Sequence, residues 1–322
     1  MIRKRAGWRG LGMLVSLVIA VVAFMALARA LKGVDLDQVL AAVRQTPALQ
    51  IVLAVLFTIL SYASLTLYDL LALRLIGRRD IPYCVAALAS FTSYPIAHGT
   101  GAVLPVSSAI RYRIYAAHGV TVANVARICF LTGLTFWLGN LAALGLSILY
   151  APDAISRIDH VSPQVNQMIA GAMLLVLALY IAWTWNSARL FGARRWSVPL
   201  PSGKNVFIQI GIGIVDLGAA ALAMYVLIPA DMNVELARVV VVFIAATLLG
   251  FASHSPAGIG VFDAAILVGL GGEHNEPLLA VLLLFRLIYH VTPFMLALAL
   301  FSLREVLRAM ERRRELARQA AG

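Results

Sequence analysis

The sequence has little charge, and most of that charge is of one sign. Only 13% of its 322 residues are Asp, Glu, Lys or Arg, whereas 61% are hydrophobic and the mean hydropathy is +0.89. Soluble domains carry about 25% charged residues, so this composition excludes an ordinary soluble protein and predicts an integral membrane protein. Basic residues outnumber acidic ones by 26 to 15, chiefly at the chain ends and in a few loops. The excess indicates orientation in the membrane and contact with anionic head groups, and it excludes nucleic acid as a partner.

Cysteine is nearly absent, and familiar catalytic motifs are missing. Cys84 and Cys129 both lie in apolar stretches, so we expect small buried side chains, not a disulfide or a metal pair. The sequence has no phosphate-binding loop ending in Lys and Ser or Thr, no nucleophile elbow and no zinc-protease helix. We therefore expect no enzyme, no cofactor and no metal. Because no ATP site is evident, any transport would be passive or driven by a gradient.

Long apolar stretches organise the chain. About 20 apolar residues suffice to cross a bilayer as a helix. Stretches of this kind are 11–31, 49–73, 122–149, 166–185, 206–228 and 277–302. They predict an all-α polytopic membrane protein with about six full spans. Basic residues before the first stretch make it resemble a signal peptide, which we expect to remain as an uncleaved anchor.

Two further apolar segments, 81–104 and 236–272, are interrupted by residues that break helices. Their glycines, prolines and histidines are Pro95, His98, Gly99 and Gly101 in the first segment, and His254, Pro256, Gly258 and Gly260 in the second. Broken backbone at membrane depth is tolerated only where protein or a wet cavity satisfies its amides. Breaks at corresponding places in two halves are typical of a transporter's central site.

The distribution of Lys and Arg predicts the topology. It places both termini in the cytoplasm and the acidic loop 150–163 outside. These sides agree only if each broken segment returns to the side it entered, as a re-entrant hairpin. The sequence then predicts an inverted-topology repeat of 1–150 and 164–303, followed by a basic cytoplasmic tail helix, 304–322. The alternatives are that each broken segment crosses once, or that the second is one span plus a short hairpin.

Ionisable side chains inside a membrane are candidates for a substrate site because burying them is costly. Ser107 and Arg111 are four residues apart and share a helix face. With Ser108, they would place a guanidinium beside hydroxyls, an arrangement that suits a phosphate. Arg111 could instead extend to the interface. Asp69, deep in the second span, either faces the substrate or pairs with an arginine from another span.

The second half offers charges of its own. Asp263 follows the second break, where it could cap a helix, meet a cationic head group or pair with Arg286. Asp216 is a further buried acid with the same open roles. His98 and His254 are either hydrogen-bonding core residues or head-group contacts, since no metal-ligand spacing surrounds them.

Four motifs, taken in order, resemble a known family. They are Tyr68-Asp69, Ser108-Ala-Ile-Arg111-Tyr-Arg113, Pro256-Ala-Gly258-Ile-Gly260-Val-Phe-Asp263 and Phe285-Arg286-Leu-Ile-Tyr289. This series resembles the lysylphosphatidylglycerol synthetase transmembrane region, the flippase domain of the multiple peptide resistance factor MprF and its stand-alone relatives. The resemblance implies movement of a phospholipid, typically aminoacyl-phosphatidylglycerol, across the bacterial inner membrane, which confers resistance to cationic peptides. It also implies that polar positions matching Asp69, Arg111 and Asp263 matter for flipping.

The sequence departs from the family pattern in ways that leave the substrate open. Ser107-Ser108 and Pro256-Ala257 stand where the family often has Ser-Gly and Pro-Gly. We also expect this chain to lack the aminoacyl-transferase domain. The predicted function is lipid translocation with a membrane phospholipid as partner. A secondary transporter of a small molecule or ion, or a scaffold for a separate lipid-modifying enzyme, remains the alternative, and a homo-oligomer remains open.

Overall fold

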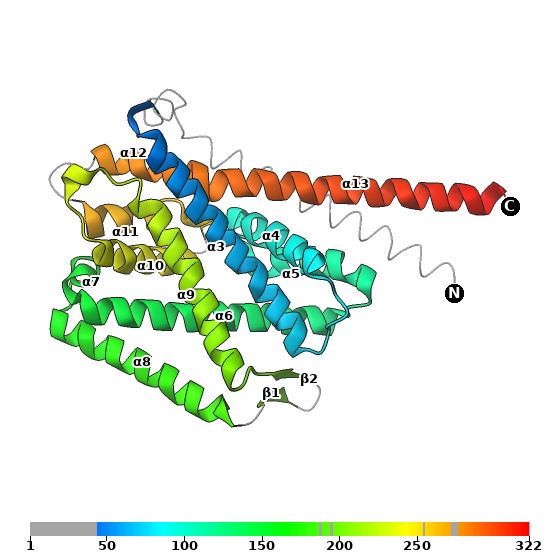
Figure 1. Cartoon of the computed structure of the whole chain (residues 1–322), viewed down its shortest axis with the longest axis horizontal. Helices are drawn as coiled ribbons and strands as arrows, with labels where there is room; N and C mark the ends of the chain where they lie inside the picture. Colours follow the sequence, from blue (N-terminus) through cyan, green and yellow to red (C-terminus); the bar gives the residue numbers. More distant parts are fainter. Residues whose placement is uncertain (1–43, 187–188, 194–195, 254, 272–275, 322) are drawn as a thin grey trace.

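The computed structural model describes residues 44–186, 189–193, 196–253, 255–271 and 276–321 (Figure 1). Most of these residues are helical, and the strands among them form one short pair, which confirms the all-α prediction. The predicted span 11–31 and its role as an anchor lie outside the described residues, as does His254.

Five of the predicted spans are long apolar helices. Helices long and apolar enough to cross a membrane are α3 (Ala48–Leu75), α6 (Val122–Tyr150), α8 (Pro163–Trp185), α9 (Lys204–Tyr225) and the run Pro277–Gln319. That last run comprises α12 (Glu276–Phe285), the π-helical turn η4 (Arg286–Val291) and α13 (Thr292–Ala321). Figure 1 shows α13 extending well beyond the other helices towards the C-terminus.

The first interrupted segment forms a helical hairpin. Helix α4 (Tyr83–Thr100) packs against α5 (Val103–Tyr115), and Gly101 makes the turn with a φ of 73°. The structure differs from the expectation at Pro95 and Gly99, because α4 continues through both residues. Proline removes one helical hydrogen bond, but the helix around it remains packed. Gly99 serves close packing instead, since a Cβ there would lie 2.5 Å from a ring carbon of Phe294 in α13.

The second interrupted segment forms another hairpin, with α10 (Leu236–Ala252) packed against α11 (Val261–Leu270). The two helices have 17 and 10 residues, fewer than the about 20 of a typical span. Arg238 of α10 donates hydrogen bonds of 3.0 and 2.7 Å to the Gly269 carbonyl oxygen of α11. Between the helices, the 3-10 turn η3 (Pro256–Gly258) contains Ala257 at a φ of 51°, a conformation that favours glycine. The family resembled by this sequence often has glycine there.

Several short elements lie where loops were expected. They are the 3-10 turns η1 (Ala116–His118) and η2 (Ala230–Met232), the helix α7 (Pro152–Asp159) and the antiparallel strands β1 (Leu190–Ala193) and β2 (Trp196–Pro199). The strands pack on α6 through Phe191, whose ring stacks on Phe130 at 5.2 Å. Cys84 is exposed, contrary to the expected burial, because it lies in the first turn of α4; Cys129 is partly buried.

The order of long helix, hairpin and long helix occurs in both halves of the described chain. In the first half it is α3, α4–α5 and α6; in the second it is α9, α10–α11 and α12–α13. The inverted orientation of 1–150 and 164–303 stays a prediction. The tail predicted for 304–322 continues α13 as helix, and its Glu305 accepts a 2.8 Å hydrogen bond from Arg113 of α5.

Helices α6 and α9 approach closely through two glycines. A Cβ placed on Gly213 of α9 would lie 2.7 Å from Gly139 Cα and 3.0 Å from the Thr135 carbonyl oxygen of α6. Beside this contact, Gln209 of α9 donates a 2.8 Å hydrogen bond to the Thr135 hydroxyl. Small residues that let helix backbones approach are a common basis of packing in membranes.

We predict that Gly213→Ala destabilises the protein by about 1–3 kcal/mol, because overpacking forces the helix backbones apart. The measurement is the thermal unfolding midpoint of purified protein in detergent. Gly211→Ala is the matched control on the same helix, since a Cβ there meets no atom within 4 Å. Equal midpoints for the two variants would contradict the close packing of α6 on α9.

Candidate functional site

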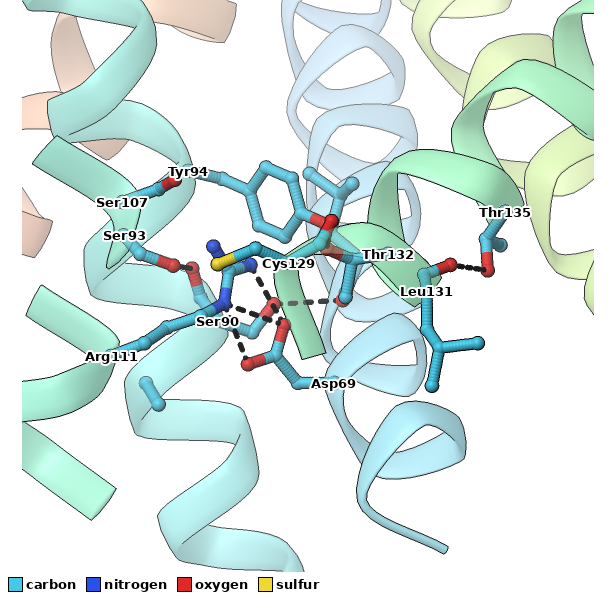
Figure 2. A network of polar contacts seen from close by, with 12 residues as sticks. Asp69, Ser90, Ser93, Tyr94, Ser107, Arg111, Cys129, Leu131, Thr132 and Thr135 are labelled. Atoms are coloured by element: carbon cyan, nitrogen blue, oxygen red, sulfur yellow. Dashed lines mark hydrogen bonds and ion pairs between the residues drawn. The ribbon is translucent and has the colours of Figure 1, made fainter. Parts of the chain in front are cut away.

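A buried ion pair joins α3 to the first hairpin. Arg111 of α5 donates from Nε and Nη2 to the carboxylate of Asp69 of α3, at 2.9 and 2.8 Å (Figure 2). The Arg111 and Asp69 side chains are 2% and 0% exposed. Tyr115, one helical turn after Arg111, donates a further hydrogen bond of 2.8 Å to Asp69 Oδ2. Of the two roles left open for Asp69, the structure therefore shows the pair with an arginine from another helix.

An aromatic ring covers this ion pair. The guanidinium carbon of Arg111 lies 4.8 Å from the centre of the Tyr94 ring of α4, within the range of a cation–π contact. Ser90 of α4 also donates a 2.7 Å hydrogen bond to the Leu65 carbonyl oxygen of α3. The pair and its surroundings thus fix α3, α4 and α5 together.

The two serines before Arg111 do not complete a phosphate site in this conformation. Ser107 and Ser108 both donate back to the Leu104 carbonyl oxygen of their own helix. The Nε and Nη2 donors of Arg111 point at Asp69. To bind these two donors, a phosphate would have to displace the Asp69 carboxylate.

A second ion pair lies at the second break and is less buried. Arg286 donates from Nε and Nη2 to the Asp263 carboxylate at 2.9 and 2.5 Å, and the two side chains are 18% and 23% exposed. Asp263 Oδ2 also accepts a 2.9 Å hydrogen bond from the Gly260 backbone N–H. Asp263 therefore caps α11 and pairs with Arg286 at once, so two of its three predicted roles are combined. Arg286 begins the π-helical turn η4, a distortion that is frequent at functional sites.

The tips of the two hairpins contact each other. Helix α4 contacts the turn η3, and the His98 ring lies 5.6 Å from the ring of Phe251 near the end of α10. The Nδ1 atom of His98 is 2.8 Å from the Tyr94 carbonyl oxygen in the preceding turn of α4. His98 is thus partly buried and makes its hydrogen bond within its own helix, and its contact with a head group stays a prediction. No described group of three or more His, Cys, Asp or Glu side chains is arranged to hold a metal ion.

A third buried carboxylate is held by hydroxyls. Asp216 of α9 is 5% exposed and accepts from Ser61 at 2.6 Å and from Tyr68 at 3.0 Å. The Ser61 hydroxyl also lies 2.8 Å from the hydroxyl of Tyr289 in η4. The sequence pointed to Asp216 but not to these partners. The seven-residue spacing of Ser61 and Tyr68, which puts both on one face of α3, was the available signal.

We predict that breaking the Asp69–Arg111 pair destabilises the protein strongly. Asp69→Ala and Arg111→Ala should each cost about 3–5 kcal/mol, because each leaves an uncompensated buried charge. The double variant should lose much less than the sum of the two, and thermal unfolding in detergent measures all three. Asp80→Ala is the control, since the Arg78–Asp80 pair lies at the surface with Asp80 60% exposed, and it should change the midpoint little. Additive losses would show that the two side chains are not coupled.

Relatives of this chain include proteins that match most of its length. An uncharacterized protein from Synechocystis sp. is 28% identical over 236 residues, 73% of this chain and 73% of that protein. Inner membrane protein YbhN from Escherichia coli is 28% identical over 279 residues, 85% of this chain and 86% of YbhN. No protein-family model matches the sequence.

Phosphatidylglycerol lysyltransferases are similar over a shorter part. The protein from Bacillus subtilis is 29% identical over 171 residues, which make up 50% of this chain but 20% of that protein. The protein from Staphylococcus haemolyticus is 29% identical over 167 residues, 49% of this chain and 18% of that protein. These similarities relate the chain to a group of membrane proteins that includes YbhN and the phosphatidylglycerol lysyltransferases.

Proposed function

We propose that this chain is a lipid translocase of the bacterial inner membrane, which moves a phospholipid such as aminoacyl-phosphatidylglycerol between leaflets. The observation that carries the proposal is the partly exposed Asp263–Arg286 pair at the second break of a largely apolar bundle. The similarity to phosphatidylglycerol lysyltransferases supports a phospholipid as the substrate class. No aminoacyl-transferase activity is proposed for this chain.

The charges of the pair match those of an aminoacylated head group. Such a head group carries a phosphate and an ammonium group, which can engage Arg286 and Asp263 respectively. Exchange of partners leaves no charge unpaired, whereas simple separation would leave two unpaired charges in a medium of low polarity. A partly exposed pair can make this exchange without the desolvation that a fully buried pair requires.

The buried Asp69–Arg111 pair has a different part in this proposal. Its side chains are closed off by Tyr94 and Tyr115, so it holds the first hairpin in place while the head group meets the second. The first hairpin lies against the second through the contact of α4 with η3. The acyl chains would remain in lipid, because the outer faces of the long helices carry exposed Leu, Val and Ile side chains.

We predict that purified protein in vesicles moves labelled aminoacyl-phosphatidylglycerol between leaflets faster than protein-free vesicles do. Arg286→Ala should slow this movement about tenfold or more, since a hydrogen bond to a charged group contributes about 1.5–3 kcal/mol. Accessibility of the label to a membrane-impermeant quencher measures the rate. Arg313→Ala, at an exposed position of the tail helix, is the control and should keep the wild-type rate.

The Asp263 carboxylate should select among head groups. Asp263→Asn keeps an oxygen that can accept from Gly260, yet it removes the negative charge that would meet an ammonium group. We predict that it slows aminoacyl-phosphatidylglycerol more than phosphatidylglycerol in the same vesicle assay. Equal slowing of both lipids would contradict the ammonium contact. No lipid movement by the wild type would overturn the proposed function, and uptake of a small solute or co-purification with a lipid-modifying enzyme would then support a transporter or a scaffold.

A further inference from the structure

Asp216 is a buried carboxylate without a cationic partner. Each of its two oxygens accepts one hydroxyl hydrogen bond, Oδ1 from Ser61 at 2.6 Å and Oδ2 from Tyr68 at 3.0 Å. Among the described residues, no Lys, Arg or His lies within ion-pair distance of it. The buried Asp69 and the partly exposed Asp263 each face an arginine fork instead. An unpaired charge of this kind in the membrane is costly and is commonly found in proton pathways.

The groups that face Asp216 are almost all uncharged. Helix α3 and the turn η4 contribute hydroxyls, and α6 meets α9 through glycine, threonine and glutamine near Gly213. The faces of α10 and α12 against α9 belong to the apolar core. Titratable and charged side chains around the carboxylate, in contact or one contact further away, are Tyr62, Tyr68, Asp69, Tyr94, Arg111, Tyr289 and His290. The two charged members of this set, Asp69 and Arg111, neutralise each other.

The hydrogen bonds around Asp216 are compatible with two states that differ by one proton. With the carboxylate ionised, Ser61 donates to Asp216 and receives a hydrogen bond from Tyr289. With the carboxyl protonated, Asp216 donates to Ser61, which turns its hydrogen towards Tyr289. Either oxygen can be the donor in the 2.8 Å contact of Ser61 with Tyr289, so the two states require hydroxyl rotation alone. Tyr68 donates to the other carboxyl oxygen in both states.

We propose that Asp216 is a reversible proton-binding site that couples the movement of lipid to a pH gradient. The step is the addition of one proton to the Asp216 carboxylate and its later release, without any other change in bonding. A proton fits the site better than a metal cation does. Both hydroxyls that contact the carboxylate direct hydrogens at it, whereas a cation needs oxygen lone pairs directed at itself.

Asp216 and its hydroxyl partners lie where a change in protonation can affect both ion pairs. They join α3, α9 and η4, and Arg286 lies in η4, three residues before Tyr289. Protonation reverses the direction of the Ser61–Tyr289 hydrogen bond. Tyr289 of η4 then accepts a hydrogen bond from Ser61 of α3 instead of donating one. On the other side, Tyr68 directly precedes Asp69 of the buried ion pair. The proton site therefore lies between the two ion pairs.

Infrared spectroscopy of the full chain in detergent tests proton binding without any transport. The wild type should show a carboxyl band that titrates with pH and that exchanges slowly in deuterated water, because the group is buried. Asp216→Asn should lose this band, whereas Asp231→Asn, which alters an exposed acid, should keep it. Asp216→Glu should restore a titrating band. No such band in the wild type, or an unchanged band in Asp216→Asn, would overturn the proposal.

A second experiment, which rests on the proposed function, tests whether lipid movement is coupled to the pH gradient. In vesicles with an imposed pH difference, the wild-type rate of lipid movement should change severalfold when the gradient is reversed. Asp216→Asn should abolish this dependence, and Tyr289→Phe should weaken it because the alternative partner of Ser61 is removed. A rate that ignores the pH gradient, or follows a sodium gradient instead, would refute proton coupling. If the wild type moves no lipid, the proposed function fails, and the infrared titration still decides whether Asp216 binds a proton.

Discussion

A carboxylate inside an apolar helix bundle must find polar partners within the chain, and three carboxylates impose this requirement here. Asp69 is neutralised by Arg111, Asp263 by Arg286, and Asp216 is held by hydroxyls alone. Each solution joins segments that are far apart in sequence. Because a charge left unpaired in such a medium costs several kcal/mol, these contacts restrict how the helices can be arranged.

The ion pairs explain how two broken segments keep a defined place. Arg111 ties α5 of the first hairpin to α3, and Asp263 ties α11 of the second hairpin to η4. The short helices α5 and α11, of 13 and 10 residues, are each joined by one of these pairs to a segment outside their own hairpin. Each hairpin therefore gains an anchor to a long helix, and the two tips come into contact at α4 and η3.

Local features of the sequence predict the long helices, but they do not identify contacts between residues that are far apart in the chain. The predicted spans 122–149 and 206–228 agree with α6 and α9 within a few residues, because apolar length is a local property of the sequence. The sequence predicts a break at Pro95, but α4 continues through this residue and ends at Thr100. Tertiary packing around α4 outweighs the local preference of proline. The cost of burying a charge predicts that Asp69 has a partner. The sequence alone does not identify Arg111 as that partner, because the two residues are 42 positions apart and meet only in the folded chain. The contact of Ser61 with Asp216 spans 155 residues; the spacing of Ser61 and Tyr68 indicates a shared helix face, but it does not identify the acid that this face meets.

The polar groups between the ion pairs form one connected path. Arg111 lies over Tyr94, whose ring meets Tyr68 edge-on at 6.1 Å, and Tyr68 donates to Asp216. From there Ser61 reaches Tyr289, which lies in the same π-helical turn as Arg286. Hydroxyls suit the centre of such a path because they can donate or accept, while an arginine can only donate. A cation beside Asp216 would hold it permanently ionised. An arginine holds each of the other two carboxylates, whereas the described partners of Asp216 are hydroxyls, and this difference is why we propose a proton site at Asp216 alone.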